Sequence, residues 1–153
     1  SMTKLQPNPL PSLARALEIA RKRPDKYLDD LFSEFIRKRA ILRAGGCERC
    51  QTPKYDIQKD NGETFEAYKT LQCAHFYGRG RKATRYDPDN GFGFCGACHI
   101  YFTAHPAEFV EWFIQQKGQQ VYDMLQARTR TPARYLDKAG IELYLKEEIK
   151  KLV

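Results

Sequence analysis

The residue types that can carry chemistry are concentrated in one stretch of the chain, residues 71 to 105. This stretch contains all three histidines and three of the five cysteines. It also contains a short loop rich in glycine and cations, from Gly78 to Arg85. A second Cys-x-x-Cys pair lies upstream, at residues 47 to 50. Paired thiols, imidazoles and a basic loop are the components of a metal-stabilised site that acts on a polyanion.

Two Cys-x-x-Cys pairs predict a metal site with four thiolate ligands, which would be Cys47, Cys50, Cys95 and Cys98. Four thiolates complete the tetrahedral shell of Zn²⁺ and leave no position for a substrate, so such a site is structural. The ion would join two distant segments of the chain and contribute folding free energy. An accidental or redox pairing of the cysteines is the alternative. The fifth cysteine, Cys73, is predicted to be a buried strand residue.

The order of His75, Asn90 and His99 resembles that of the HNH, or ββα-metal, nucleases. In that family the first histidine ends a strand and deprotonates the water that attacks a phosphodiester. The asparagine holds the connecting turn, and a residue after the second cysteine pair binds a catalytic cation, Mg²⁺ or Mn²⁺. The resemblance therefore implies catalytic roles for all three residues, through a base with a near-neutral pKa and a cation that offsets charge. The structural alternatives are a strand-end histidine, a turn asparagine and a histidine packed behind the zinc site.

A longer resemblance covers roughly two-thirds of the chain, from about residue 25 to residue 128. It is to the NinG, or Rap, recombination endonucleases of lambdoid phages, and the cysteine pairs are also similar to those of phage endonuclease VII. The resemblance implies a structure-specific DNA endonuclease of phage or prophage origin that acts on branched intermediates such as Holliday junctions and D-loops. The motifs that match in order are Phe35-Ile36-Arg37-Lys38-Arg39, the first cysteine pair, Ala74-His75-Phe76, Arg85 to Asn90, Cys95 to His99 and Gly118-Gln119.

Two positions differ from these family patterns, and both concern the catalytic cation. The NinG pattern has an aspartate three residues before the first histidine, where this chain has Gln72. Many HNH enzymes have an acidic residue or a histidine directly before the base, where this chain has Ala74. Hard cations such as Mg²⁺ prefer oxygen ligands. Asp87 or Asp89 in the following turn are the candidates for the replacement carboxylate, and weak cation binding or lost catalysis are the alternatives.

The loop between the two catalytic candidates is purely basic and predicts contacts with DNA phosphates. Its cations have no acidic neighbour within the loop, and they are Arg79, Arg81, Lys82 and Arg85. A solvated loop without a ligand is the alternative. The net charge of +7 also favours a polyanionic partner. We therefore expect DNA in branched form as the partner, with a homodimer as an open alternative to a monomer.

Periodicity predicts an α+β fold: a ββα-metal core with a structural four-cysteine zinc site, flanked by helices at both ends. Leu28, Leu31, Phe32 and Phe35 have the spacing of a buried helical stripe. The other face of that helix, with Arg37, Lys38, Arg39 and Arg43, is predicted to be solvated, with a DNA-backbone contact as the second interpretation. Helices are expected over residues 12–23, 25–43, 96–102, 106–118, 119–127 and 138–152, with strands at 67–76 and 92–94 and a loose hairpin within 51–66.

The predicted organisation is an N-terminal helical arm (1–46), a zinc-stapled HNH nuclease core (47–128) and a C-terminal helix (129–153). Residues 1 to 10 show no periodicity and are expected to lack regular structure. No apolar run approaches the ~18 residues of a membrane span, and no signal-peptide pattern opens the chain. With paired, reduced cysteines this predicts a cytoplasmic protein, in the host cell if phage-encoded, without a membrane partner.

The function predicted from the sequence is metal-dependent hydrolysis of DNA phosphodiesters, with structural Zn²⁺ and catalytic Mg²⁺ or Mn²⁺. One alternative is a non-catalytic zinc module that binds DNA or assists recombination, which the residues at positions 72 and 74 favour. The other is a sequence-specific HNH nuclease, for which no separate recognition domain is visible.

Overall fold

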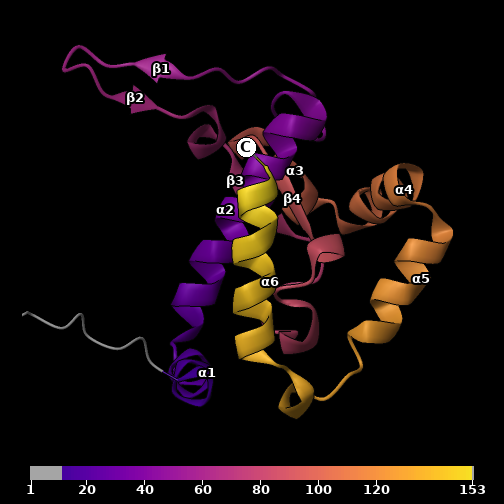
Figure 1. Ribbon diagram of the computed structural model, residues 1–153. Coiled ribbons are helices and arrows are strands. Elements are labelled where there is room, and N and C mark those ends of the chain that lie inside the picture. Colours follow the sequence, from indigo (N-terminus) through magenta and orange to yellow (C-terminus); the bar gives the residue numbers. More distant parts are fainter. Residues whose placement is uncertain (1–11, 153) are drawn as a thin grey trace, which may run out of the picture.

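The computed structural model describes residues 12 to 152. The expectation for residues 1 to 10 lies outside this range. Over the described residues the protein has an α+β fold with six α-helices and two small antiparallel sheets (Figure 1). The helices are α1 (Leu13–Arg21), α2 (Asp25–Ala44), α3 (Gly96–Ala104), α4 (Pro106–Lys117), α5 (Gln119–Arg128) and α6 (Lys138–Lys151). The paired strands are β1 (Ile57–Gln58) with β2 (Thr64–Phe65), and β3 (Gln72–His75) with β4 (Gly91–Phe94).

The helix ends follow local sequence signals. The Ser12 hydroxyl accepts a hydrogen bond from the backbone N–H of Arg15 (3.2 Å) and caps α1. Helix α2 ends at Ala44 because Gly45 follows it in the left-handed conformation (φ 68°). These two signals are readable in the sequence, and the predicted boundaries of both helices agree with the structure within about two residues.

The strand predicted over residues 67 to 76 is shorter than expected and begins at Gln72. Residues Ala67–Thr70 form a 3-10 turn instead. Two polar contacts stabilise the turn: the Asp56 carboxylate accepts from the backbone N–H of Ala67 (2.7 Å), and the Thr70 hydroxyl donates to the carbonyl of Ala67 (2.7 Å). Such side-chain bonds to the backbone compete with strand pairing, and a β-rich composition does not reveal them.

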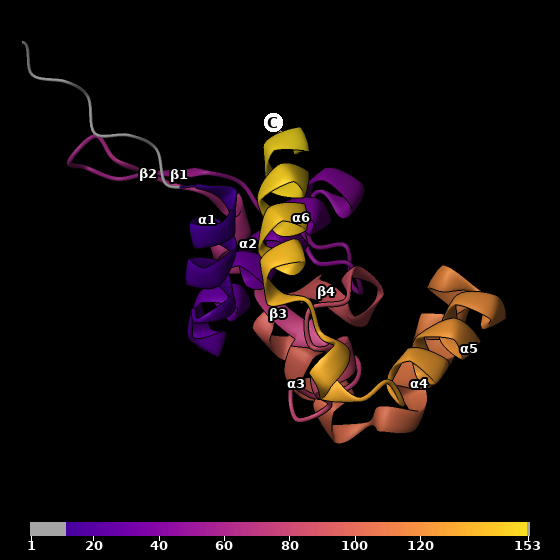
Figure 2. The ribbon, with the colours of Figure 1, turned by 60° about the horizontal axis from the view of Figure 1, so that its bottom comes forward.

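Helix α2 is the central element, because it packs across the β3–β4 sheet on one side and along α6 on the other (Figure 1). One cluster of buried side chains lies between α2, Tyr86 and α6, and includes Phe32 and Leu145. A second, larger cluster joins α2 and the β3–β4 sheet to α3, α4 and α5, which lie on the far side of the sheet in Figure 2. The predicted stripe of α2 is confirmed, since Leu28, Phe32 and Phe35 are buried and Leu31 packs against the first cluster.

The prediction of a fully solvated basic face on α2 is wrong at Arg39. This side chain is buried and donates to the carbonyl oxygens of Pro88 and Gly91, at 3.0 Å each. Pro88 lies in the turn before β4 and Gly91 is the first residue of β4, and one guanidinium can donate to both carbonyls. Arg37 and Lys38 remain partly exposed and Arg43 is exposed.

The close approach of α2 to β4 depends on glycine. A Cβ atom at Gly93 would overlap the Cβ of Ala40, and one at Gly91 would lie 2.8 Å from Ile36 Cδ1. Gly93→Ala is therefore expected to lower the free energy of unfolding by about 1–3 kcal/mol, the usual cost of overpacking. Urea denaturation measures this. Gly80→Ala is the control, because a Cβ there meets no atom within 4 Å. Equal stability of the two variants would contradict the packing described.

The β1–β2 hairpin confirms the loose hairpin expected within residues 51 to 66, with Ile57 opposite Phe65 and Gly62 at positive φ (84°) in the turn. It extends away from the rest of the molecule in both views (Figures 1 and 2). Among the described helices, none combines the length and the apolar composition needed to cross a membrane.

Candidate functional site

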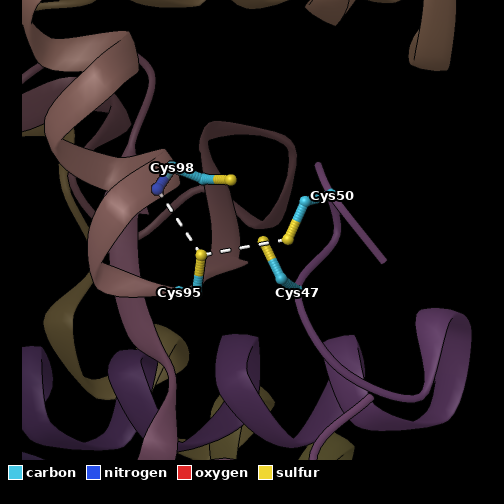
Figure 3. A group of neighbouring side chains, drawn as sticks. All are labelled: Cys47, Cys50, Cys95 and Cys98. Carbon is cyan, nitrogen blue, oxygen red and sulfur yellow. Dashed lines mark hydrogen bonds between the residues drawn. The ribbon is translucent and has the colours of Figure 1, made fainter. Parts of the chain in front are cut away.

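Four cysteine sulfurs point toward one another where the loop after α2 meets the start of α3 (Figure 3). Cys47 and Cys50 come from the loop, Cys95 is the N-cap of α3, and Cys98 lies in its first turn. Their ligand atoms all lie within 4.8 Å of one another. Over residues 12 to 152, no other group of three or more His, Cys, Asp or Glu side chains converges in this way. The four predicted ligands are thus brought together, and the cluster could hold a metal ion such as zinc.

The loop that carries the first cysteine pair is fastened to β4 by Glu48. The backbone N–H of Glu48 donates to the Gly93 carbonyl (2.9 Å), and the Glu48 carboxylate accepts from the Gly93 N–H (2.7 Å). Because β4 leads directly into Cys95, the two bonds set one cysteine pair against the other. Gly93 therefore helps to position the cysteine cluster as well as the contact with α2.

The chemistry of the donors fits a divalent cation. Burial raises the pKa of Cys47 and raises that of Cys98 to about 12, whereas a hydrogen bond from the Thr52 hydroxyl lowers the pKa of Cys50 to about 6. The Arg49 guanidinium lies 3.6 Å from the Cys98 sulfur. Buried thiols become thiolates only when a cation offsets their charge. Cys47 and Cys98 are buried, Cys95 is half-buried and Cys50 is exposed, and four cysteine sulfurs are the donor set that suits zinc.

His75 is the last residue of β3, and one of its two ring nitrogens is hydrogen-bonded to the backbone. Its Nε2 lies 3.0 Å from the backbone carbonyl oxygen of Arg85. A carbonyl only accepts, so Nε2 carries the proton and Nδ1 keeps the lone pair. The ring packs against Phe32 at 5.2 Å between centroids, and burial lowers the pKa of His75 below its usual value. His75 is therefore neutral at pH 7 and has one nitrogen able to accept a proton.

His99 has the complementary arrangement on α3. Its Nδ1 lies 2.8 Å from Oε1 of Gln72, so the amide oxygen accepts from Nδ1 and Nε2 keeps the lone pair. Burial lowers the pKa of His99 as well. Histidines that bind metals commonly donate their second N–H to an oxygen in this way. Gln72 thus lies directly beside the candidate cation ligand.

The two histidines line one pocket of about 490 Å³. The exposed Arg79 contributes a cation to its wall. Helix α2 contributes three side chains that the sequence did not point to, Asp29, Asp30 and Ser33. Cys73 also lines the pocket, and burial raises the pKa of its thiol to about 12, so it is an unreactive thiol.

The carboxylates expected to serve the cation, Asp87 and Asp89, do not line this pocket. Both are bound by Arg128 of α5, whose guanidinium lies 2.6 Å from Asp87 Oδ2 and 2.9 Å from Asp89 Oδ2. The Asp87 carboxylate also accepts from the backbone N–H of Asp89 (3.0 Å) and shapes the turn before β4. Through Arg128, the two aspartates link this turn to α5.

Asn90 is fully buried and joins the two ends of the basic loop. Its amide donates to the carbonyls of Tyr77 and Thr84, at 2.9 Å each, and its Oδ1 accepts from the N–H of Tyr77 (2.7 Å). Every polar atom of the side chain is thereby bonded within the protein. Asn90 shapes the loop and does not line the pocket.

The basic loop contains two kinds of cation. Arg79, Arg81 and Lys82 are exposed. Arg85 is largely covered, and its guanidinium makes two hydrogen bonds to Asp29 of α2, at 2.9 and 2.6 Å. The loop has no acidic residue in its sequence, but α2 supplies Asp29 and, at 3.9 Å from the guanidinium, Asp25. Arg85 therefore differs from the other three cations predicted to contact DNA.

The cysteine cluster and the histidine pocket share helix α3, because His99 directly follows Cys98. Comparison with family models, curated proteins and solved structures finds no match to this chain. The geometry itself provides a neutral imidazole with a free nitrogen, a second imidazole suited to a cation, and an exposed arginine in one pocket. These groups can deprotonate a water and hold a phosphate beside it.

Proposed function

We propose that the protein is a metal-dependent DNA endonuclease of the HNH type, with β3, β4 and α3 as its ββα-metal core. One observation carries the proposal: His75 and His99 line the same pocket, and an oxygen acceptor binds one nitrogen of each ring and leaves the other free. The order of elements supports it, since β3 pairs antiparallel with β4 and α3 follows at once. The Asn90 side chain holds together the two ends of the loop between β3 and β4, a role that the family resemblance implies.

In the proposed reaction, His75 is the general base. Its Nδ1 takes a proton from the water that attacks the phosphorus, and burial keeps the ring neutral beforehand. Arg79 binds the phosphate from the pocket wall. A divalent cation, Mg²⁺ or Mn²⁺, would offset charge on the phosphate and the leaving oxygen. His99 and Asp30 are the pocket side chains suited to hold it, because within residues 12–152 the Asp30 carboxylate is paired only with the exposed Lys26 (2.8 Å).

We further propose that the cysteine cluster binds structural Zn²⁺. Four thiolates suit this ion, and they would leave it no open position for catalysis. The ion would hold the start of α3, and therefore His99, against the loop that follows α2. Zinc then supports the site without taking part in the reaction.

The proposed substrate is branched DNA of the kind formed in recombination, in keeping with the family resemblance and a phage or prophage origin. The test is incubation of the pure protein with labelled duplex, fork and four-way junction in Mg²⁺, Mn²⁺ or EDTA. We expect cation-dependent cleavage that is strongest on a branched substrate. A non-catalytic DNA-binding module is the second candidate, favoured by Gln72 in place of an aspartate and by the lack of a second converged ligand group among residues 12–152. It predicts binding without cleavage in every cation.

Replacing the three exposed loop cations, Arg79, Arg81 and Lys82, with alanine is expected to weaken DNA binding by a similar factor for every sequence. Such residues contact phosphates and release counterions, so the slope of log affinity against log salt should fall by about 0.9 per lost contact. Fluorescence anisotropy at several salt concentrations measures this. Lys54→Ala, outside the loop, is the control. An unchanged slope would locate the DNA elsewhere on the surface.

A further inference from the structure

Arg85 connects helix α2 to the imidazole of His75. Its guanidinium donates through Nε and one terminal nitrogen to the two carboxylate oxygens of Asp29, at 2.9 and 2.6 Å. Its backbone carbonyl accepts from Nε2 of His75 at 3.0 Å. The three residues thus form a continuous series of hydrogen bonds from α2 into the pocket. The proposed reaction gives Asp29 no part, and the sequence assigned Arg85 to DNA.

We propose that Asp29 and Arg85 are positioning residues, whose ion pair fixes the tautomer and orientation of His75. Two parallel hydrogen bonds fix the orientation of the Arg85 guanidinium relative to the Asp29 carboxylate. They therefore also restrict the backbone of Arg85, to which the guanidinium is attached. The carbonyl of a restricted residue presents its oxygen to Nε2 in one direction. His75 is then held as the Nε2–H tautomer, with Nδ1 available to accept a proton.

The surroundings of the pair support a fixed geometry. The side chains of Arg85 and Asp29 are only 17% and 19% exposed, so solvent and salt screen their attraction weakly. The preceding carbonyl, of Thr84, is held by Asn90 (2.9 Å). Asp29 and Phe32 are three residues apart on α2, so the same helix face that clamps Arg85 also packs against the His75 ring. Helix α2 therefore sets both the position and the protonation pattern of the base.

The direct test is nitrogen NMR of the imidazole in the full chain with ¹⁵N-labelled histidine, above the pKa of His75. We expect the wild type to show a single neutral tautomer with the proton on Nε2. Asp29→Asn and Arg85→Lys should each show averaging between the two tautomers, because neither retains the charged fork. Glu34→Gln is the matched control, since it breaks another ion pair of α2, with Lys38 (2.9 Å), outside the pocket. A single Nε2–H tautomer in both pocket variants would overturn the proposal.

The consequence for catalysis rests on the proposed nuclease function, whereas the tautomer measurement does not. Asp29→Asn and Arg85→Lys are expected to lower kcat about 10–100-fold, the usual effect of losing a group that orients a functional histidine, with KM little changed. If Arg85 instead contacted a DNA phosphate, Arg85→Lys would raise KM and leave kcat unchanged. That result would refute the positioning role. Absence of cleavage by the wild type would defeat the nuclease proposal alone, because the NMR result would still decide whether the ion pair holds the ring. Equal melting temperatures of the variants exclude unfolding as the cause.

Discussion

His75→Ala is expected to lower the rate of DNA cleavage at least ~100-fold, which is the scale of general base catalysis. The variant removes the nitrogen that accepts the proton from water but leaves the exposed cations of the loop in place. DNA affinity should therefore remain close to that of the wild type. Single-turnover cleavage with excess protein measures the rate, and anisotropy in EDTA measures affinity. Cleavage that survives the substitution would refute His75 as the base while leaving the metal cluster unaffected.

His105→Ala is the matched control for this experiment. The His105 ring stacks on Tyr101 at 4.1 Å between centroids and does not line the pocket, so its removal should not change the rate. His105 lies at the N-cap position of α4, but its side chain makes no capping bond. His99→Ala should act differently from both, by raising the cation concentration needed for half-maximal rate.

The pH dependence provides an independent check on the same base. Burial lowers the pKa of His75, the Arg85 carbonyl bond and Asp29 raise it, and Arg79 and Arg85 lower it through their charge, with a lowered pKa as the net effect. A base works only in its neutral form, so the rate should fall as pH decreases through this pKa. The acidic limb of the rate profile is therefore expected below pH ~6.5, the ordinary value for histidine. A limb well above that value would assign the titration to another group.

The sequence predicted the parts of the fold that depend on neighbours along the chain. Helix α2 was readable because Leu28, Phe32 and Phe35 repeat with helical spacing and Gly45 follows the last turn. The cysteine cluster could be predicted because each pair has the Cys-x-x-Cys spacing of a metal-binding motif, and two such pairs together supply the four ligands of a zinc site. In both cases the signal lies in short stretches of the chain: one for the helix and two for the cysteines.

The features that the sequence missed depend on contacts between distant segments. The polar position of Arg39 in the helical pattern predicted exposure, but the carbonyls of Pro88 and Gly91, 49 and 52 positions away along the chain, accept from its guanidinium. No sequence signal pointed to Asp29 and Asp30, because only the packing of α2 beside β3 brings them into the histidine pocket. Arg85 looked free because its partner lies in that same helix. No local sequence pattern shows which distant group will form an ion pair or hydrogen bond with a charged side chain.

Loss of one cluster thiol is expected to remove the metal and unfold the region around α3. Structural zinc sites contribute an apparent ~10–16 kcal/mol in small zinc-binding domains, comparable to the whole stability of about 5–15 kcal/mol of a typical domain. Cys95→Ser should therefore contain no stoichiometric zinc, and a strong chelator should have the same effect on the wild type. Elemental analysis of protein purified without chelators measures the metal content.

The single tryptophan reports on this unfolding. Trp112 packs on Phe94 at 5.3 Å and on Phe102 at 5.6 Å between ring centroids, and Phe102 lies one helical turn after Cys98. Opening the cluster should expose these rings and shift the Trp112 emission to longer wavelength. The buried cluster between α2 and α6 shares no residue with this one, so part of the helical circular dichroism should persist.

Cys73→Ser is the matched control for thiol loss, because Cys73 lies outside the metal cluster and borders the histidine pocket. It should retain one zinc per chain and the emission of the wild type. If Cys95→Ser instead matched Cys73→Ser in metal content, melting and emission, the cysteines would not be a metal site. The start of α3 would then be held by Glu48, Gly93 and the aromatic cluster alone, and His99 would keep its position without an ion.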